Sequence, residues 1–146
     1  MTEKRESRKY APIAAVAATI GAIAGSFIVN KLFEDSNNPD LEVQVAEAAA
    51  ELRKQLPMKV DDQTTLQSVV SAGNSFVYHY TVSVNGSDVD LPTFSATMQK
   101  QLTAYVCESP TMAPSVKKGV EYIYIHMSAD AVRLSEVAID KADCGF

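Results

Sequence analysis

The chain has 146 residues, 47% of them hydrophobic, and a formal net charge of −5 at neutral pH. That charge is unevenly distributed, because residues 1–10 carry a net +2 and residues 34–146 carry a net −8. Phosphate binding depends on Lys and Arg releasing counterions, so a part this acidic is not expected to bind nucleic acid. Residues 34–146 are long enough for one domain with its own core.

An apolar stretch, residues 11–33, lies between these two charged parts, and from Ala11 to Val29 it holds no charge. A transmembrane helix needs roughly 20 apolar residues. The basic residues before the stretch belong on the cytoplasmic side of a membrane. The sequence therefore predicts a cytoplasmic basic tail over residues 1–10 and a single-pass signal-anchor helix over residues 11–33, with the rest of the chain in the periplasm.

Two other interpretations of this stretch remain open. Ala22-Ile23-Ala24 has the small-x-small form of a signal-peptidase site, which would release a soluble periplasmic protein. The stretch could instead be a buried helix of a soluble protein. The anchor is favoured because the apolar run continues past Ala24 to Val29.

Small residues recur within the predicted anchor at Ala17, Gly21 and Gly25. Such a stripe lets two helices approach closely in a membrane, so it is a candidate helix-dimer face and the chain a possible homodimer. The alternative is an Ala-rich anchor without a partner.

The pattern after the anchor predicts an α+β domain over residues 41–146, preceded by a linker over residues 34–40. A helix is expected over residues 41–56, capped by Asn38 with Pro39 at its first position. It would bind a partner or pack on its own domain. A second helix is expected to end near Cys107, capped by Thr93 or Ser95.

Period-two alternation and turn residues predict two hairpins. The first has strands over residues 66–70 and 76–84, and the second over residues 120–127 and 132–139. A short helical turn is expected over residues 113–118. The predicted fold is therefore a four-stranded, mostly antiparallel sheet with helices packed on one face, in the order α-β-β-α-β-β.

Cys107 and Cys144 are the two cysteines of the chain. In an oxidising compartment such a pair is most simply one disulfide. Two cysteines alone do not make a metal site, and the pair lacks the Cys-x-x-Cys spacing of a reactive dithiol.

Tyr78, Tyr80, Tyr122 and Tyr124 lie in the two best predicted strands. If those strands pair, the rings form an aromatic ladder. The ladder would either be an interaction surface or cross-strand packing beneath a helix.

The sequence holds no nucleotide-binding loop, nucleophile elbow, zinc spacing or calcium-binding loop. We therefore expect no catalytic residue, no metal and no cofactor.

The part from residue 56 to residue 144 resembles a group of small exported bacterial proteins without an assigned activity. The resemblance is carried by the turn at Gly73-Asn74, Val106-Cys107, Gly119-Val120 and the ending Ala142-Asp143-Cys144. It implies a membrane-anchored or periplasmic domain of helix–hairpin–helix–hairpin form with one disulfide. One departure is the turn over residues 128–131, where such proteins often carry an Asp-x-x-Gly turn.

The sequence thus favours a non-enzymatic, membrane-anchored periplasmic accessory or protein-interaction module, whose partner is another envelope protein. A cleaved, soluble periplasmic binding protein is the first alternative. A small hydrolase or redox enzyme is the second.

Overall fold

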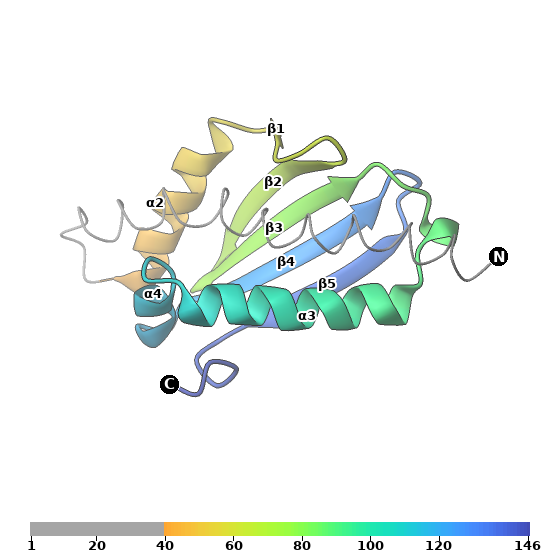
Figure 1. Cartoon of the computed structure of the whole chain (residues 1–146). Coiled ribbons are helices and arrows are strands. Elements are labelled where there is room, and N and C mark those ends of the chain that lie inside the picture. Colours follow the sequence, from red (N-terminus) through yellow and green to blue (C-terminus); the bar gives the residue numbers. More distant parts are fainter. Residues whose placement is uncertain (1–39) are drawn as a thin grey trace.

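The computed structural model describes residues 40–146, which form a five-stranded sheet with helices (Figure 1). The helical elements are Leu41–Arg53 (α2), Gly86–Asp88 (the 3₁₀ turn η1), Leu91–Glu108 (α3) and Ala113–Lys117 (α4). The strands are Met58–Lys59 (β1), Thr64–Ala72 (β2), Ser75–Val82 (β3), Glu121–Ser128 (β4) and Arg133–Ile139 (β5). The α+β class and the order of the longer elements agree with the prediction.

The sheet has five strands, not the four predicted, and their spatial order is β1-β2-β3-β4-β5. β1 was missed because a strand of two residues shows no alternation. The β1–β2, β2–β3 and β4–β5 pairs are antiparallel, whereas β3 and β4 are parallel. The parallel pair follows from the connection, because the chain returns through α3 and α4 before it enters β4.

Helix α2 begins at residue 41 as predicted, but its N-cap is Asp40, two residues after the predicted Asn38. The Oδ1 atom of Asp40 accepts a hydrogen bond of 3.0 Å from the backbone N–H of Glu42. Its buried residues, Val45, Ala48, Ala49 and Leu52, face the sheet, and the helix packs on β2 and β3. Helix α2 therefore packs on its own domain.

Helix α3 is capped by Asp90, and Thr93 and Ser95 both lie inside it, so the predicted caps were wrong. Pro92 in its first turn fits because the N–H groups there have no helical partner. Its buried stripe, Phe94, Met98, Leu102 and Val106, packs against the sheet at β5.

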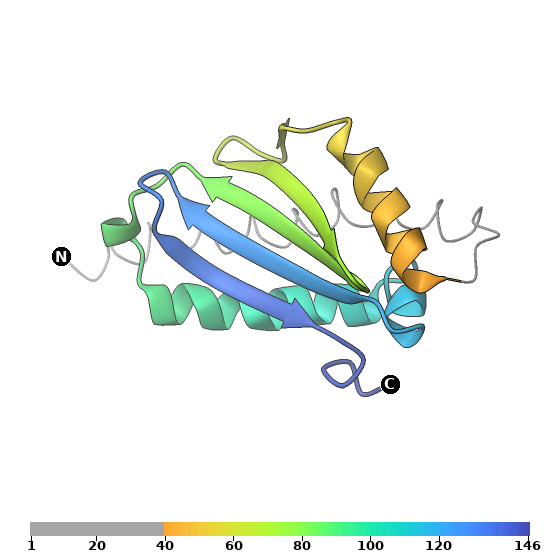
Figure 2. The same ribbon diagram turned by 180° about the vertical axis from the view of Figure 1, so that it is seen from behind.

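The core lies on one face of the sheet only. The buried side chains of β2, β3, β4 and β5 share this face, which α2 and α3 cover. The opposite face carries no described helix; seen from behind, the sheet passes in front of α3 (Figure 2). Of the apolar side chains on that face, Val77 and Ile123 are half-buried, whereas Val70 is exposed and Ile125 is buried.

The predicted anchor over residues 11–33, its candidate dimer face at Ala17, Gly21 and Gly25, and residues 34–39 of the linker lie outside the described residues. Within residues 40–146, no helix has both the length and the apolar character needed to cross a bilayer.

Candidate functional site

The four tyrosines singled out in the sequence come together in the core. β3 and β4 pair in register, with Tyr78 opposite Tyr124 and Tyr80 opposite His126. Phe76, Tyr78, Tyr80, Tyr122 and Tyr124 form two adjacent rows of stacked rings, which we call the aromatic strip. The Tyr78 and Tyr124 ring centroids are 5.1 Å apart, and those of Phe76 and Tyr122 are 5.5 Å apart. The aromatic ladder is thus formed.

The side chains of the strip are shielded from solvent, each at most 1% exposed. The four tyrosines therefore do not form an exposed interaction surface, which corrects that interpretation. They belong to cross-strand packing on the helix-covered face. Period-two alternation places them on one face but does not say which face the helices cover.

The tyrosine hydroxyls differ in their hydrogen bonding. Tyr122 Oη lies 2.7 Å from Ser115 Oγ, which itself donates to the backbone carbonyl of Met112. The hydroxyls of Tyr78, Tyr80 and Tyr124 are buried without a partner among the described residues. Burial raises the pKa of all four phenols, and the nearby Tyr105 of α3 raises those of Tyr78, Tyr80 and Tyr124 further. They stay protonated at physiological pH and are not proton-transfer groups.

His126 continues the strip at the far end of β4. Its ring stacks on Tyr80 with centroids 4.9 Å apart, and Phe94 meets it edge-on at 6.1 Å. Ser135 Oγ lies 3.3 Å from His126 Nδ1, whereas Nε2 has no partner among the described residues. Burial lowers the pKa of this histidine from 6.5 to about 4. The second histidine, His79, lies half-buried on the opposite face of the sheet.

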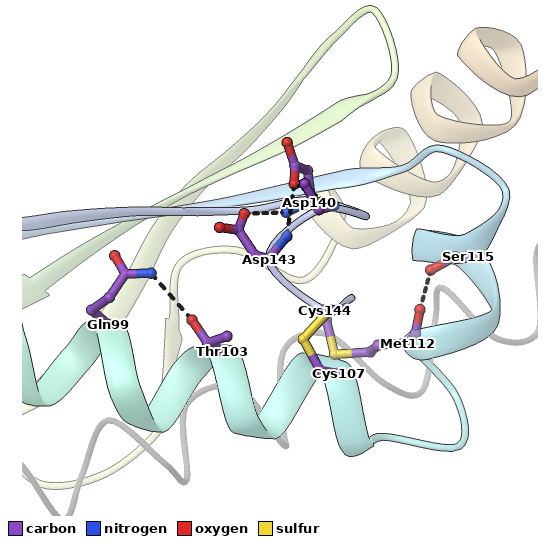
Figure 3. The surroundings of a disulfide bond; sticks show 9 residues. Gln99, Thr103, Cys107, Met112, Ser115, Asp140, Asp143 and Cys144 are labelled. Carbon is purple, nitrogen blue, oxygen red and sulfur yellow. Dashed lines mark hydrogen bonds between the residues drawn. A yellow bond between two sulfur atoms is a disulfide. The ribbon is translucent and has the colours of Figure 1, made fainter. Parts of the chain in front are cut away.

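Cys107 and Cys144 form a disulfide, as the sequence indicated. Their Cα atoms are 5.2 Å apart, and the bond joins the last turn of α3 to the segment after β5 (Figure 3). Asp140 Oδ1 accepts hydrogen bonds from the backbone N–H groups of Ala142 and Asp143, which shapes the turn that presents Cys144. The disulfide therefore staples a helix to the edge of the sheet.

A pocket of about 420 Å³ lies at the carboxyl end of α3. Its described lining residues are Tyr105, Glu108, Ser109, Pro110 and Thr111. Glu108 is the one carboxylate among them, and the described lining holds no histidine and no cysteine. Nucleophilic and acid–base catalysis need a nucleophile, a base and an orienting group within hydrogen-bond reach, and this lining does not supply them.

A small polar network joins the turn over residues 128–131 to η1, at the end of the sheet where β3 and β4 both finish. Asp130 accepts hydrogen bonds from Ser128 Oγ and from the backbone N–H of Gly86 at η1. Gly86 is required there, because a Cβ atom at this position would lie 2.6 Å from the Cβ of Val132. Ala131 takes a left-handed φ of 62°, the conformation that a glycine at the end of the turn would favour.

Within residues 40–146, no three His, Cys, Asp or Glu side chains lie close enough to hold a metal ion. His126 pairs only with Ser135, His79 lies on the other side of the sheet, and both cysteines are used in the disulfide. Ser135 and His126 do bring a hydroxyl beside an imidazole, 3.3 Å apart, but both side chains are buried, at 5% and 0% exposure.

The domain of residues 40–134 matches a family model described as Domain of unknown function (DUF8479). The chain belongs to this family. No curated protein sequence matches it significantly.

Three solved structures share this fold at low sequence identity. A candidate secreted protein of Pseudomonas aeruginosa (PA3611) has a TM-score of 0.56 and 14% identity, over 74% of this chain and 99% of that one. The pilotin EpsS of the Vibrio vulnificus type 2 secretion system has a TM-score of 0.60 and 16% identity, and the match covers 71% of this chain and 91% of EpsS. The type II secretion system pilotin AspS of Vibrio cholerae has a TM-score of 0.56 and 12% identity, and the match covers 71% of this chain and 92% of AspS.

These findings correct the resemblance drawn from the sequence. The chain belongs to the DUF8479 family and shares its fold with two secretion-system pilotins, and no helix–hairpin–helix–hairpin domain is indicated. The physical difference lies in the sheet, where the extra strand β1 and the parallel β3–β4 pair make one continuous five-stranded layer.

Proposed function

We propose that this chain is a non-enzymatic accessory protein of the bacterial cell envelope that binds a component of a type II secretion system. The observation that carries the proposal is the shared fold with two pilotins of such systems, which spans more than nine-tenths of each pilotin chain. The burial of the Ser135–His126 pair supports it further, because a pair shielded from solvent is not open to a substrate.

Residues 41–146 would form the periplasmic domain, and residues 11–33 would anchor it in the inner membrane with residues 1–10 in the cytoplasm. The charge difference across the stretch, +2 before it and −8 after it, supports this orientation. The disulfide supports an oxidising compartment for the domain.

Release as a soluble periplasmic protein is the second candidate. The Ala22-Ile23-Ala24 sequence favours it, as does the fold shared with a candidate secreted protein. The intact mass of the mature protein separates the two candidates, because cleavage after Ala24 removes about 24 residues.

The proposal is tested in cells that carry a type II secretion system. Deletion of the gene should reduce secretion of a type II substrate, and crosslinking in intact membranes should join this chain to a component of that system. Normal secretion after deletion, with crosslinks only to proteins outside the system, would show that the proposed function is wrong.

A further inference from the structure

The carboxyl end of α3 is not capped by the residues that follow it. The last carbonyl groups of a helix have no partner within the helix and need donors from elsewhere. In a continuing helix, the carbonyls of residues 106–108 would be paired by the N–H groups four residues on. The first of those positions is Pro110, which has no N–H group. Thr111 and Met112 donate theirs to Ser109 Oγ. These carbonyls therefore receive no donor from the residues that follow the C-cap.

The last turn of α3 also adds negative charge where a helix is already negative. The aligned peptide dipoles give a helix C-terminus a partial negative charge, which Lys, Arg or His in the last turn usually offsets. α3 has no basic residue there and ends on Glu108. The ion pairs formed between described residues, Lys54–Glu51 and Arg133–Glu136, lie elsewhere. This end of the helix is therefore electronegative, and its carboxylate forms no ion pair with another described residue.

The electronegative end borders the pocket of about 420 Å³, a size typical of a ligand site. Its described lining contains no basic side chain. Lys117 of the adjacent α4 lies instead over the Phe146 ring, 4.7 Å from the ring centroid. Tyr105 and Glu108 both line the pocket, and their spacing makes them neighbours on the helix surface. Because an aromatic ring attracts a cation placed over its face, the ring and the carboxylate favour the same kind of ligand.

We propose that this pocket binds the guanidinium group of an arginine side chain presented by a protein partner. The carboxylate and the helix dipole favour a cation, the uncapped carbonyls favour hydrogen-bond donors, and the ring favours a flat group that stacks on it. A guanidinium is planar, always charged and carries five N–H donors. A lysine ammonium supplies the charge but not the planar shape. The net charge of −8 over residues 34–146 would draw a basic partner to this surface.

This inference deepens the proposed function and rests on it, because it names the chemistry of the contact with the partner. The pocket itself is tested on the purified chain, where binding does not depend on secretion. Normal secretion after deletion of the gene would overturn the proposed function and leave the arginine site standing. Absence of arginine binding would overturn the site and leave the proposed function standing.

Titration of the purified, ¹⁵N-labelled full chain, followed by NMR, tests the site directly. The chain is held in an uncharged maltoside detergent, because a choline-type detergent would itself bring a cation to the ring. The probes are Nα-acetyl-arginine amide and Nα-acetyl-citrulline amide, which has nearly the same shape without the charge. We expect saturable shifts of the backbone amides of Ser109 and Thr111 with the arginine probe, and binding of the citrulline probe at least about tenfold weaker. Equal affinity for the two probes, or shifts only outside the pocket, would overturn the proposal.

Two further probes define what the pocket recognises. Nα-acetyl-lysine amide should bind about threefold more weakly than the arginine probe, because it lacks the planar fork. Equal binding of the lysine probe would overturn the assignment to arginine. Free arginine carries an α-carboxylate that Glu108 repels, so it should bind more weakly than the capped amide. Tighter binding of free arginine would show that the site takes the amino acid rather than a side chain of a protein, and would also overturn the proposal.

Matched variants assign the binding to the pocket. Glu108→Gln removes the charge and keeps the shape, and it should weaken binding of the arginine probe about fivefold, the upper range for an exposed ion pair. Glu47→Gln removes an exposed glutamate of α2 and should leave the affinity within about twofold. Equal effects of these two variants would overturn the proposal. Tyr105→Leu should weaken binding about threefold through loss of the ring, and if it fails to fold, the two glutamate variants decide.

Discussion

Replacing His126 should remove a large part of the acid sensitivity of the domain. The side chain is 0% exposed and lies between Tyr80 and Phe94. Burial disfavours the imidazolium, which lowers the pKa in the folded chain to about 4 from 6.5. The unfolded chain therefore binds a proton at a pH where the folded chain does not.

The sign and size of the effect follow from that difference. Above pH 6.5 the His126 imidazole is neutral in both the folded and the unfolded state, so its titration does not change the free energy of unfolding with pH. As the pH falls from 6.5 towards 4, the unfolded state gains a proton first, so the free energy of unfolding decreases. Between pH 7.5 and pH 4.5 this single group should lower the free energy of unfolding by about 2.5 kcal/mol.

Urea unfolding at these two pH values, followed by circular dichroism, measures the effect. The acidic residues contribute their own pH dependence, so the comparison is between the wild type and His126→Phe, which keeps an aromatic ring against Tyr80. The wild type should lose about 2.5 kcal/mol more than this variant on acidification. His79→Gln, on the opposite sheet face, should behave as the wild type does. Equal losses in the wild type and His126→Phe would refute the reasoning.

Three further predictions concern stability. Replacing both Cys107 and Cys144 by Ser should lower the free energy of unfolding by about 4 kcal/mol, because the bond closes a loop with a sequence separation of 37; a loss below about 1 kcal/mol in urea unfolding would contradict the chain-entropy argument. Gly86→Ala should destabilise the domain by about 1–3 kcal/mol through its clash with Val132, and Val132→Ala in the same chain should restore part of it; additive losses in thermal unfolding would contradict the clash. Tyr122→Phe should lower the free energy of unfolding by about 1 kcal/mol, because the Tyr122 hydroxyl is hydrogen-bonded to Ser115. Tyr124→Phe removes a hydroxyl without a partner among the described residues, so it should be neutral or stabilising. Equal losses for the two variants in urea unfolding would show that the hydrogen bond is not the cause.

Local patterns predicted most of the elements. Apolar spacing indicated α2 and α3, and alternation indicated β3, β4 and β5, because each pattern depends on residues that lie near one another in the chain. The caps were wrong for the same reason. Asp40 and Asp90 take the N-cap positions, while Thr93 lies inside α3 and Asn38 lies outside the described residues. Several Asx and Ser/Thr residues stand close together there, and propensity alone does not choose among them.

By itself, the sequence determined the charge asymmetry, the α+β class and the disulfide. It also determined that the tyrosines of each strand lie on the same face of that strand. Only the tertiary structure decided that β3 and β4 are parallel, that β1 adds a fifth strand, and that the tyrosine face is the covered one. Both faces of β4 are apolar, so alternation gives no preference between them. The physical reason is that burial depends on where α2 and α3 pack, and those contacts join residues far apart in the chain. His126 shows the consequence, since alternation places it with Tyr122 and Tyr124, but only the packing of Tyr80 and Phe94 around it lowers its pKa.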